Sequence, residues 1–462
     1  MNNIKITLED LFNLPGAVIY NPDNYKPVTA VSIDSRNIPK NALFIAIKGK
    51  KFNGSKFIKS AIKNGARAIV INKHDFNNAR NLDIPIVTVP DTTLTLGSIA
   101  GLWRKKLKTK IIAITGSSGK TSTKDILVQL LSEKFSVNKT IGNNNNHIGV
   151  PLTILSTGNK HDILIVELGT NHFGEIKYST EIVQPDFALI TNIGNSHLEF
   201  FKNRNGVFKE KSALINFTET HKGISFINND DKILNQYGRN LVNKFTFAFN
   251  AKADVKGFIS GYNNEGQPEI LITYANRSFK LAIPLYGQQN AKNFLAAVTI
   301  ALKCGLNLKQ IKSGAKKLVA ADKRLKVRKF RKFMLIDDTY NANPESMKSS
   351  FELLNKISAY KQRIAIIGDM FELGKDEINL HKGLFPVIRK NKIDSVFTIG
   401  NRMKYLNELL KNSETEAIHF KSRNVLKSFL NKRNFVNTVI LVKGSRGMKM
   451  EEFVQVIIDR EI

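Results

Sequence analysis

Lys120 and Thr121 close a glycine-rich turn whose composition suits the binding of phosphate groups. The turn reads TGSSGKTS and lies between an apolar run, Ile111–Ile114, and a segment that we expect to be helical. Glycines let successive backbone N–H groups point at phosphate oxygens, and the helix places the positive end of its dipole there. We therefore expect Lys120 to reach the β and γ phosphates of a nucleotide and Thr121 to bind magnesium through its hydroxyl. The expected phosphate-binding residues are Gly116, Ser117, Ser118, Gly119, Lys120, Thr121 and Ser122.

This loop is shorter than the usual G-x-x-x-x-G-K-[ST] pattern, because Ile114 stands where that pattern has its first glycine. The alternative interpretation is a plain glycine–serine turn before a helix. The order of strand, loop with Gly-Lys-Thr and helix favours the phosphate site.

Two further polar side chains follow apolar runs of the same region. Glu167 ends the run that begins at Ile163, and His197 comes shortly after the run Phe187–Ile190. Ligands gather at the carboxyl edge of a parallel sheet, and a carboxylate there suits magnesium, which prefers oxygen ligands. We therefore expect Glu167 to bind magnesium and His197 to help it hold a second metal. Taken alone, Glu167 is better explained as a charged residue that ends a strand, and His197 as an ordinary loop histidine.

The chain is strongly basic, with a formal net charge of +31. A polyanionic partner such as nucleic acid is one explanation. The lysines are spread along the whole chain without a dense basic arm, so we expect no specific nucleic-acid partner and only weak, salt-sensitive binding to DNA. Lys209 and Lys211 lie on a predicted helix after His197, and their spacing alone indicates a solvated charged face.

Composition places the chain among ordinary globular proteins, with 42% hydrophobic and 24% charged residues. The single cysteine, Cys304, excludes an internal disulfide and a cysteine-based zinc site, and it suits a reducing compartment. The N-terminus has no signal-peptide pattern, and no apolar run approaches the roughly 18 residues of a membrane helix. We expect a soluble, cytoplasmic, monomeric protein without membrane insertion.

Apolar runs that alternate with helical patterns predict an α/β fold in three domains, 1–106, 107–320 and 321–462. The second and third regions each contain several such runs, which favours largely parallel sheets covered on both faces. No G-x-G-x-x-G is present in the third region, so nothing there supports dinucleotide binding. The predicted strands are Ala17–Tyr20, Ala66–Ile71, Ile111–Ile114, Ile163–Val166, Phe187–Ile190, Phe333–Asp337, Arg363–Asp369, Ser395–Gly400 and Thr438–Gly444.

Several motifs in their order along the chain together resemble the Mur ligases. The short loop, the strand-end Glu167 and the segment NIGNSHLEFF with its following lysine-rich helix carry the resemblance in the second region. It extends over essentially the whole chain. The other matching segments are SIDSRNIPKNALFIAIKGKKFNGSKFI (Ser32–Ile58), NNNNHIGVPLTIL (Asn143–Leu155), GQQNAKNFLAA (Gly287–Ala297), IDDTYNANPESM (Ile336–Met347), GDMFELG (Gly368–Gly374) and VKGSRGM near the end.

The resemblance implies a small α/β uridine-nucleotide domain, a central phosphate-loop ATPase domain with a parallel sheet, and a C-terminal Rossmann-like domain. It implies an ATP-dependent, ADP-forming ligase that uses magnesium and joins D-Ala-D-Ala to UDP-MurNAc-tripeptide through an acyl phosphate, in peptidoglycan precursor synthesis. The alternative is a sibling ligase that adds the third amino acid. The sequence YNANPES favours the dipeptide ligase, since diaminopimelate-adding siblings carry Asp-Asn-Pro-Arg in the comparable area.

The resemblance also implies roles for individual residues. Lys120 would stabilise the migrating phosphoryl group, Thr121 and Glu167 would hold magnesium, and His197 would help hold a second magnesium. Lys211, with Lys209 as the alternative, would carry a carbamate. The residues implied for nucleotide contacts are Arg324, Asp338, Tyr340 and Asn341 in the third domain and Asn290 near adenine. The residues implied for the other substrates are Ser35 and Arg36 near the uracil nucleotide, and Asn145, Asn146 and His147 on the acceptor route.

Overall fold

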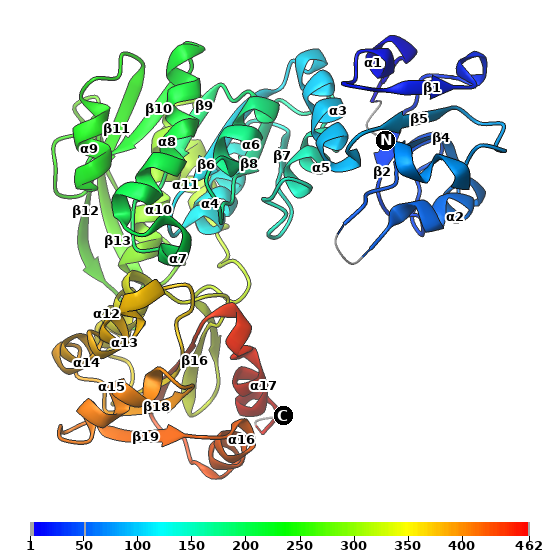
Figure 1. Ribbon diagram of the computed structural model, residues 1–462. Coiled ribbons are helices and arrows are strands. Elements are labelled where there is room, and N and C mark those ends of the chain that lie inside the picture. The colour runs from blue at the N-terminus through cyan, green and yellow to red at the C-terminus, as the bar shows by residue number, and fades with distance from the viewer. Residues whose placement is uncertain (1–3, 50–51, 461–462) are drawn as a thin grey trace. The chain divides into compact units, whose positions relative to one another are not determined.

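The computed structural model describes residues 4–49 and 52–460. The chain divides into two compact units. One unit comprises Met1–Thr115, Phe135–Ala188 and Ala213–Ile224, and the other comprises Gly116–Lys134, Leu189–Ser212 and Ser225–Ile462. Over the described residues the strands form three sheets, which confirms the predicted α/β fold class (Figure 1). The domain limits 1–106, 107–320 and 321–462 stay predictions.

The first sheet has five strands in the order β1-β5-β4-β3-β2. Strands β2 to β5 are parallel, whereas β1 is antiparallel to β5. Trp103 of the long helix α3 is buried and donates its indole N–H to the carbonyl of Thr157 at 2.8 Å. The elements are α1 (Leu8–Phe12), β1 (Val18–Tyr20), β2 (Ala30–Ser32), β3 (Ala42–Ile45), α2 (Ile58–Lys63), β4 (Ala66–Asn72), β5 (Ile86–Val89) and α3 (Thr92–Lys106).

The second sheet has nine strands in the order β14-β13-β12-β11-β10-β9-β6-β8-β7. Strands β6, β7 and β8 pair in parallel, as do β10, β11 and β12. Its strands are β6 (Lys110–Thr115), β7 (Val137–Lys139), β8 (Ile163–Glu167), β9 (Phe187–Ile190), β10 (Ile224–Asn228), β11 (Lys244–Ala248), β12 (Val255–Tyr262), β13 (Pro268–Tyr274) and β14 (Arg277–Ala282). Its helices are α4 (Lys120–Leu131), α5 (Gly149–Leu155), α6 (Glu175–Val183), α7 (Leu198–Phe201), α8 (Arg204–Thr220), α9 (Lys232–Gly238), α10 (Gly287–Lys303) and α11 (Leu308–Lys316).

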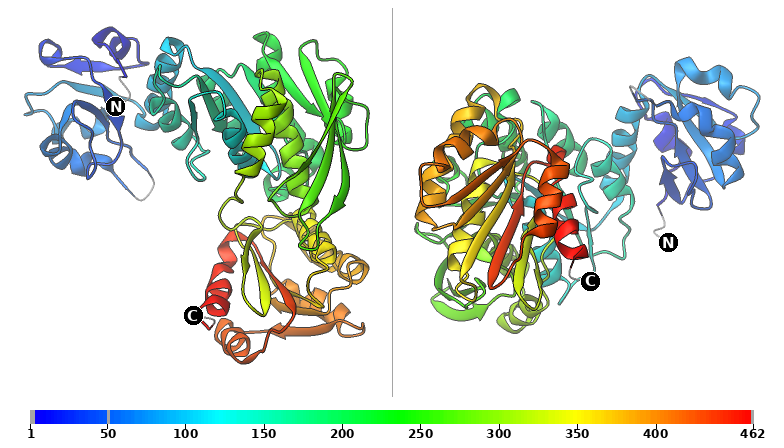
Figure 2. Two further views of the ribbon diagram at one scale, coloured as in Figure 1. Left: turned by 180° about the vertical axis from the view of Figure 1, so that it is seen from behind. Right: turned by 90° about the horizontal axis from the view of Figure 1, so that it is seen from below.

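The antiparallel strands β12, β13 and β14 were not predicted from the sequence; they are the long green arrows in the left view of Figure 2. Ala275 and Asn276 connect β13 to β14 with φ values of 48° and 59°. Two successive positive φ angles are the geometry of a type I′ hairpin turn, which matches the twist of the flanking strands. The second sheet is therefore mixed rather than purely parallel.

The third sheet has the order β15-β16-β20-β17-β18-β19 and is parallel except for β15. Alternate residues of β16 enter two cores, because successive side chains of a strand point to opposite faces. Met334 packs with helices α12, α14 and α15, and Phe333 packs with α16 and α17. The elements are β15 (Lys326–Lys329), β16 (Phe333–Asp338), α12 (Pro344–Lys356), β17 (Gln362–Gly368), α13 (Glu377–Lys382), α14 (Phe385–Lys390), β18 (Ser395–Ile399), α15 (Met403–Leu410), β19 (Glu416–Phe420), α16 (Arg423–Lys432), β20 (Thr438–Lys443) and α17 (Glu451–Asp459).

Each predicted strand appears with its ends within one or two residues of the prediction. Long apolar runs were sufficient for the central strands such as β6, β8, β9 and β16, because both faces of these strands are buried, whereas β1 is largely exposed. Among the described residues, no helix has the length and apolar character that crossing a bilayer requires.

Candidate active site

The glycine-rich turn connects the buried strand β6 to the first turn of α4, as predicted. Gly116 and Gly119 have φ values of 148° and 78°, a region of backbone conformation that favours glycine. Helix α4 begins at Lys120 with Gly119 as its N-cap. The loop therefore presents a helix N-terminus whose first backbone N–H groups can bind an anion.

The segment that follows β9 holds this loop in shape. Ser118 donates its backbone N–H to Asn192 Oδ1 at 3.0 Å, and Asn192 Nδ2 donates to Ser118 Oγ at 3.0 Å. Thr191 Oγ1 donates to the carbonyl of Ser118 at 2.6 Å. Ser117 Oγ accepts the backbone N–H of Gly194 at 2.9 Å. These contacts organise the loop around a second strand end, so Asn192 is a site residue that we did not select from the sequence.

Gly116 lies so close to the same segment that a larger residue does not fit. A Cβ atom on Gly116 would lie 1.9 Å from Thr191 Oγ1. We expect Gly116→Ala to destabilise the fold by roughly 2 kcal/mol or more, since both the positive φ and the overlap are unfavourable. Gly101→Ala is the control, because Gly101 lies within α3 with nothing within 4 Å of its added Cβ. That change should stabilise by roughly 0.5–1 kcal/mol; denaturant midpoints that fall equally for both variants would contradict the account.

Lys120 folds back over the loop, and its ammonium group donates a hydrogen bond to the carbonyl of Gly116 at 2.7 Å.

Lys211 of helix α8 is buried, with 1% of its surface exposed, whereas Lys209 is exposed. Burial lowers the pKa of Lys211 well below its ordinary value of 10.5, and repulsion from Lys120 lowers it further, against the opposing effect of Glu210. A buried amine with a strongly lowered pKa beside a phosphate loop is a candidate functional group.

A cavity of about 360 Å³ lies beside the loop. It is lined by Asn192 and Gly194 after β9, by Lys292 and Asn293 of α10, and by Glu345 at the start of α12. A Cβ on Gly119 would lie 2.4 Å from Asn293 Oδ1, so α10 packs directly on the loop. Asn290, predicted to lie near adenine, is buried in α10 and donates its amide N–H to the carbonyl of Tyr286 at 3.0 Å.

Glu167 ends β8 as predicted and is 2% exposed. Its Oε1 accepts a hydrogen bond from Asn145 Nδ2 at 2.8 Å, so two residues predicted for different roles are in direct contact. Asn146 Oδ1 accepts the backbone N–H groups of Ile148 and Gly149 at 3.1 and 2.9 Å, which orders the start of α5. His147 beside it is exposed.

Ser35 and Arg36 lie in the turn that follows β2. Ser35 is buried, and its carbonyl accepts the amide N–H of Asn64 at 2.8 Å. The Arg36 guanidinium is exposed and forms two hydrogen bonds with Asp34, at 2.9 and 2.8 Å. Hydrogen bonding from Arg36 lowers the pKa of Asp34 to about 2. Arg36 is thus held by a partner within its own turn.

His197 has a positive φ of 51° and is followed directly by α7. Its Nδ1 lies 2.7 Å from Glu372 Oε2, and this contact lowers the pKa of the Glu372 carboxyl group. Glu372, which also has a positive φ, belongs to the segment GDMFELG that carried the family resemblance. Nothing in the sequence indicates that Glu372 contacts His197, since the two residues are far apart along the chain.

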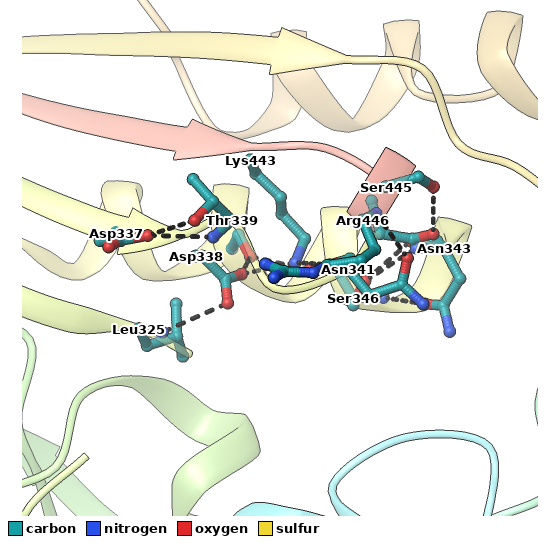
Figure 3. A network of polar contacts seen from close by, with 12 residues as sticks. Leu325, Asp337, Asp338, Thr339, Asn341, Asn343, Ser346, Lys443, Ser445 and Arg446 are labelled. Atoms are coloured by element: carbon teal, nitrogen blue, oxygen red, sulfur yellow. Dashed lines mark hydrogen bonds and ion pairs between the residues drawn. The ribbon is translucent and has the colours of Figure 1, made fainter. Parts of the chain in front are cut away.

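The predicted nucleotide-facing residues of the third sheet gather at its carboxyl edge. The Arg324 guanidinium lies 3.5 Å from the ring centroid of Tyr340, as in a cation–π stack. Asp338 is nearly buried, and its Oδ2 lies 2.6 Å from Lys443 Nζ (Figure 3). Asn341 accepts a hydrogen bond from the same lysine through its carbonyl, at 3.0 Å. Lys443 is a further residue that we did not select.

The glycine-rich loop at the start of α4, the parallel strands around it and the polar side chains at the strand ends together define an α/β protein of the phosphate-loop class. Models of the Mur ligase middle domain, the Mur ligase glutamate ligase domain and the Mur ligase family catalytic domain match residues 114–301, 323–446 and 27–103. A relative named UDP-N-acetylmuramoyl-tripeptide–D-alanyl-D-alanine ligase, from Buchnera aphidicola, is 36% identical over 98% of both chains. The chain belongs to the Mur ligase family.

Solved structures agree with this assignment. A crystal structure of MurF from Acinetobacter baumannii matches with a TM-score of 0.87 and 27% identity, over 99% of this chain and 100% of that chain. The structure of MurF ligase from Thermotoga maritima in complex with ADP matches with a TM-score of 0.83 and 27% identity, over 93% of this chain and 97% of that chain.

Proposed function

We propose that this chain is an ATP-dependent ligase that joins D-Ala-D-Ala to UDP-MurNAc-tripeptide and releases ADP and phosphate. The observation that carries the proposal is the full-length similarity to a relative named for this reaction, at 36% identity over 98% of both chains. Cytoplasmic location and a monomeric state are parts of the same proposal.

The chemistry requires activation of a carboxylate, which is a poor electrophile at neutral pH. Transfer of the γ-phosphoryl group of ATP to the tripeptide carboxylate creates an acyl phosphate with a good leaving group. The amine of D-Ala-D-Ala then attacks the carbonyl carbon, and phosphate leaves. The loop Gly116–Ser122 and Lys120 stabilise the charge of the migrating phosphoryl group, and no protein nucleophile is needed.

The side chains proposed to bind magnesium suit that ion. Thr121 offers a hydroxyl and Glu167 a carboxylate, both hard oxygen ligands. Bound magnesium would neutralise the charge that develops on the phosphate oxygens. Among the described residues no group of three or more His, Cys, Asp or Glu side chains gathers as a metal cluster. Magnesium needs only one or two protein ligands when substrate phosphates and water complete its coordination shell. His197 is proposed to serve a second magnesium.

The environment of Lys211 supports the proposed carbamate. Carbon dioxide reacts with a neutral amine, and burial beside Lys120 favours the neutral form of the Lys211 side chain. The carbamate would replace a buried amine, whose protonated form Lys120 repels, with an anion that Lys120 attracts. Lys209 is exposed and lacks this environment, so Lys211 is the proposed site.

Replacing Glu167 with glutamine keeps its shape and its contact with Asn145 but removes its charge. We expect the magnesium concentration for half-maximal activity to rise roughly tenfold or more, because a hard cation loses a carboxylate ligand. Glu181→Gln, at an exposed carboxylate on α6, is the control and should leave that concentration unchanged. Equal magnesium dependence of the two variants would remove Glu167 from the proposed metal site.

The substrates are tested by phosphate release from ATP with UDP-MurNAc-tripeptide and D-Ala-D-Ala, supplied together and each omitted in turn. We expect release only with both, together with a product heavier than the tripeptide precursor by one dipeptide residue unit. A product that gains a single amino acid instead would identify the sibling ligase that adds the third residue.

A further inference from the structure

The carboxyl edge of the third sheet contains a buried ion pair that the proposed chemistry does not use directly. Lys443 and Asp338 are neighbours in the parallel pairing of β20 with β16, and Nζ lies 2.6 Å from Oδ2. The Lys443 side chain is 2% exposed. Taking two charges out of water is unfavourable enough that an apolar pair of similar volume is often as stable or more stable. Stability alone therefore does not explain this pair.

Lys443 also connects two loops at this edge (Figure 3). Its ammonium group donates a second hydrogen bond to the carbonyl of Asn341 at 3.0 Å. Arg446 donates its backbone N–H to Asn341 Oδ1 at 3.3 Å, and Ser445 Oγ donates to the carbonyl of Ala342 at 3.3 Å. The loop after β16 is thus fastened to the loop after β20, and Lys443 lies where the two meet.

Asp338 extends the network to the chain that precedes β15. Its Oδ1 accepts the backbone N–H of Leu325 at 3.2 Å, and Tyr340 donates its backbone N–H to the carbonyl of Lys323 at 3.0 Å. Lys323 and Leu325 have φ values of 57° and 50°. Residues other than glycine rarely hold such angles unless their surroundings impose them, and such strain is concentrated at functional sites.

Arg324 lies between these two strained residues, and its guanidinium is stacked on the ring of Tyr340 at 3.5 Å. Both parts of the stack depend on the network: Asp338 holds the backbone beside Arg324, and Lys443 holds the loop that carries Tyr340. Without Lys443, Asp338 would be a buried carboxylate without its cation, and the stack would lose its support.

We propose that Lys443 is a positioning residue, which acts through Asp338 and Asn341 to fix the Arg324–Tyr340 stack in one orientation for the nucleotide. Asp338 transmits this support, because its Oδ2 accepts hydrogen bonds from Lys443 and Ser350 and its Oδ1 accepts the backbone N–H of Leu325. The proposal rests on the proposed function and on the nucleotide contact that the family resemblance implies for Arg324.

A double-mutant cycle tests it. The measured quantity is kcat/KM for ATP, from phosphate release with the other two substrates saturating, in Arg324→Ala, Lys443→Met and the double variant. We expect each single change to lower kcat/KM roughly tenfold or more, and the double variant to stay within roughly twofold of Arg324→Ala, since Lys443 acts through Arg324. Losses that multiply in the double variant would overturn the proposal.

Val442→Ala is the matched control, because Val442 is fully buried on the same strand and its truncation destabilises the same sheet. It should lower the melting temperature without lowering kcat/KM; a loss of kcat/KM equal to that of Lys443→Met would show that Lys443 has only a structural role.

If Lys443→Met does not fold, Ser350→Ala removes one hydrogen bond to Asp338, at 2.8 Å, and the same non-additivity with Arg324→Ala is expected. Wild-type protein without dipeptide-dependent phosphate release would instead refute the proposed function.

Discussion

Lys211→Met is expected to slow ligation strongly while making the fold more stable. The change removes the amine that would carry the carbamate, and we expect kcat to fall by roughly 10²–10³-fold, the size of effect seen when one preorganised electrostatic group is lost. The change also removes a fully buried amine whose protonation is disfavoured by burial and by Lys120. In bicarbonate-free buffer we expect a gain of roughly 1 kcal/mol or more in the free energy of unfolding.

The gain in stability has a defined dependence on pH. The pKa of Lys211 is lowered in the folded chain and is 10.5 in the unfolded chain, so between these values the unfolded chain binds the extra proton. The stability of the wild type therefore rises with pH through this window, and the destabilising contribution of Lys211 disappears above about 10.5. The advantage of Lys211→Met should shrink as pH increases from 7 towards 10.

Lys209→Met is the matched control, because Lys209 lies on the same helix but is exposed. It should change neither kcat nor the melting temperature appreciably. Bicarbonate should raise the activity of the wild type and of Lys209→Met, and leave the low activity of Lys211→Met unchanged. Loss of activity in Lys209→Met, with Lys211→Met still active, would reverse the assignment.

Lys120→Ala is the second change with a large expected effect. In this structure its ammonium group donates a hydrogen bond to the carbonyl of Gly116. We propose that it contacts the migrating phosphoryl group during the reaction. We expect kcat to fall by roughly 10²–10³-fold, because one cation stabilising the transition-state charge is lost. The melting temperature should change little, since the side chain is partly exposed.

Single-turnover phosphate release separates this chemical step from product release. Lys160→Ala, at an exposed lysine elsewhere, should behave as the wild type. A Lys120→Ala variant that keeps the wild-type single-turnover rate would show that the loop does not use its lysine for phosphoryl transfer.

The burial of Lys211 and the exposure of Lys209 could have been predicted from the sequence. Lys211 lies four residues after Val207 and three before Leu214, so a helix places it on the same face as these buried residues. Lys209 lies two residues away, on the other side of the helix. A lysine within an apolar stripe therefore predicts a buried amine.

The role of Asp338 could not be predicted in the same way. Its main partner, Lys443, is 105 residues further along the chain, and only the pairing of β16 with β20 brings them together.

The hairpin of β13 and β14 was missed for a different reason. Its turn, Ala275-Asn276, lacks the glycine that marks most type I′ turns. Local patterns predicted the strands and the loop, whereas contacts between distant strand ends needed the structure.

The acyl phosphate is the central claim, and isotope transfer tests it most directly. UDP-MurNAc-tripeptide with both oxygens of its terminal carboxylate labelled is incubated with ATP, magnesium, D-Ala-D-Ala and the wild-type protein, and the released phosphate is analysed by mass spectrometry. Activation of the carboxylate by phosphoryl transfer predicts one labelled oxygen in each phosphate released. Unlabelled phosphate accompanying formation of the pentapeptide product would mean that the bond forms without an acyl phosphate, and would contradict the account.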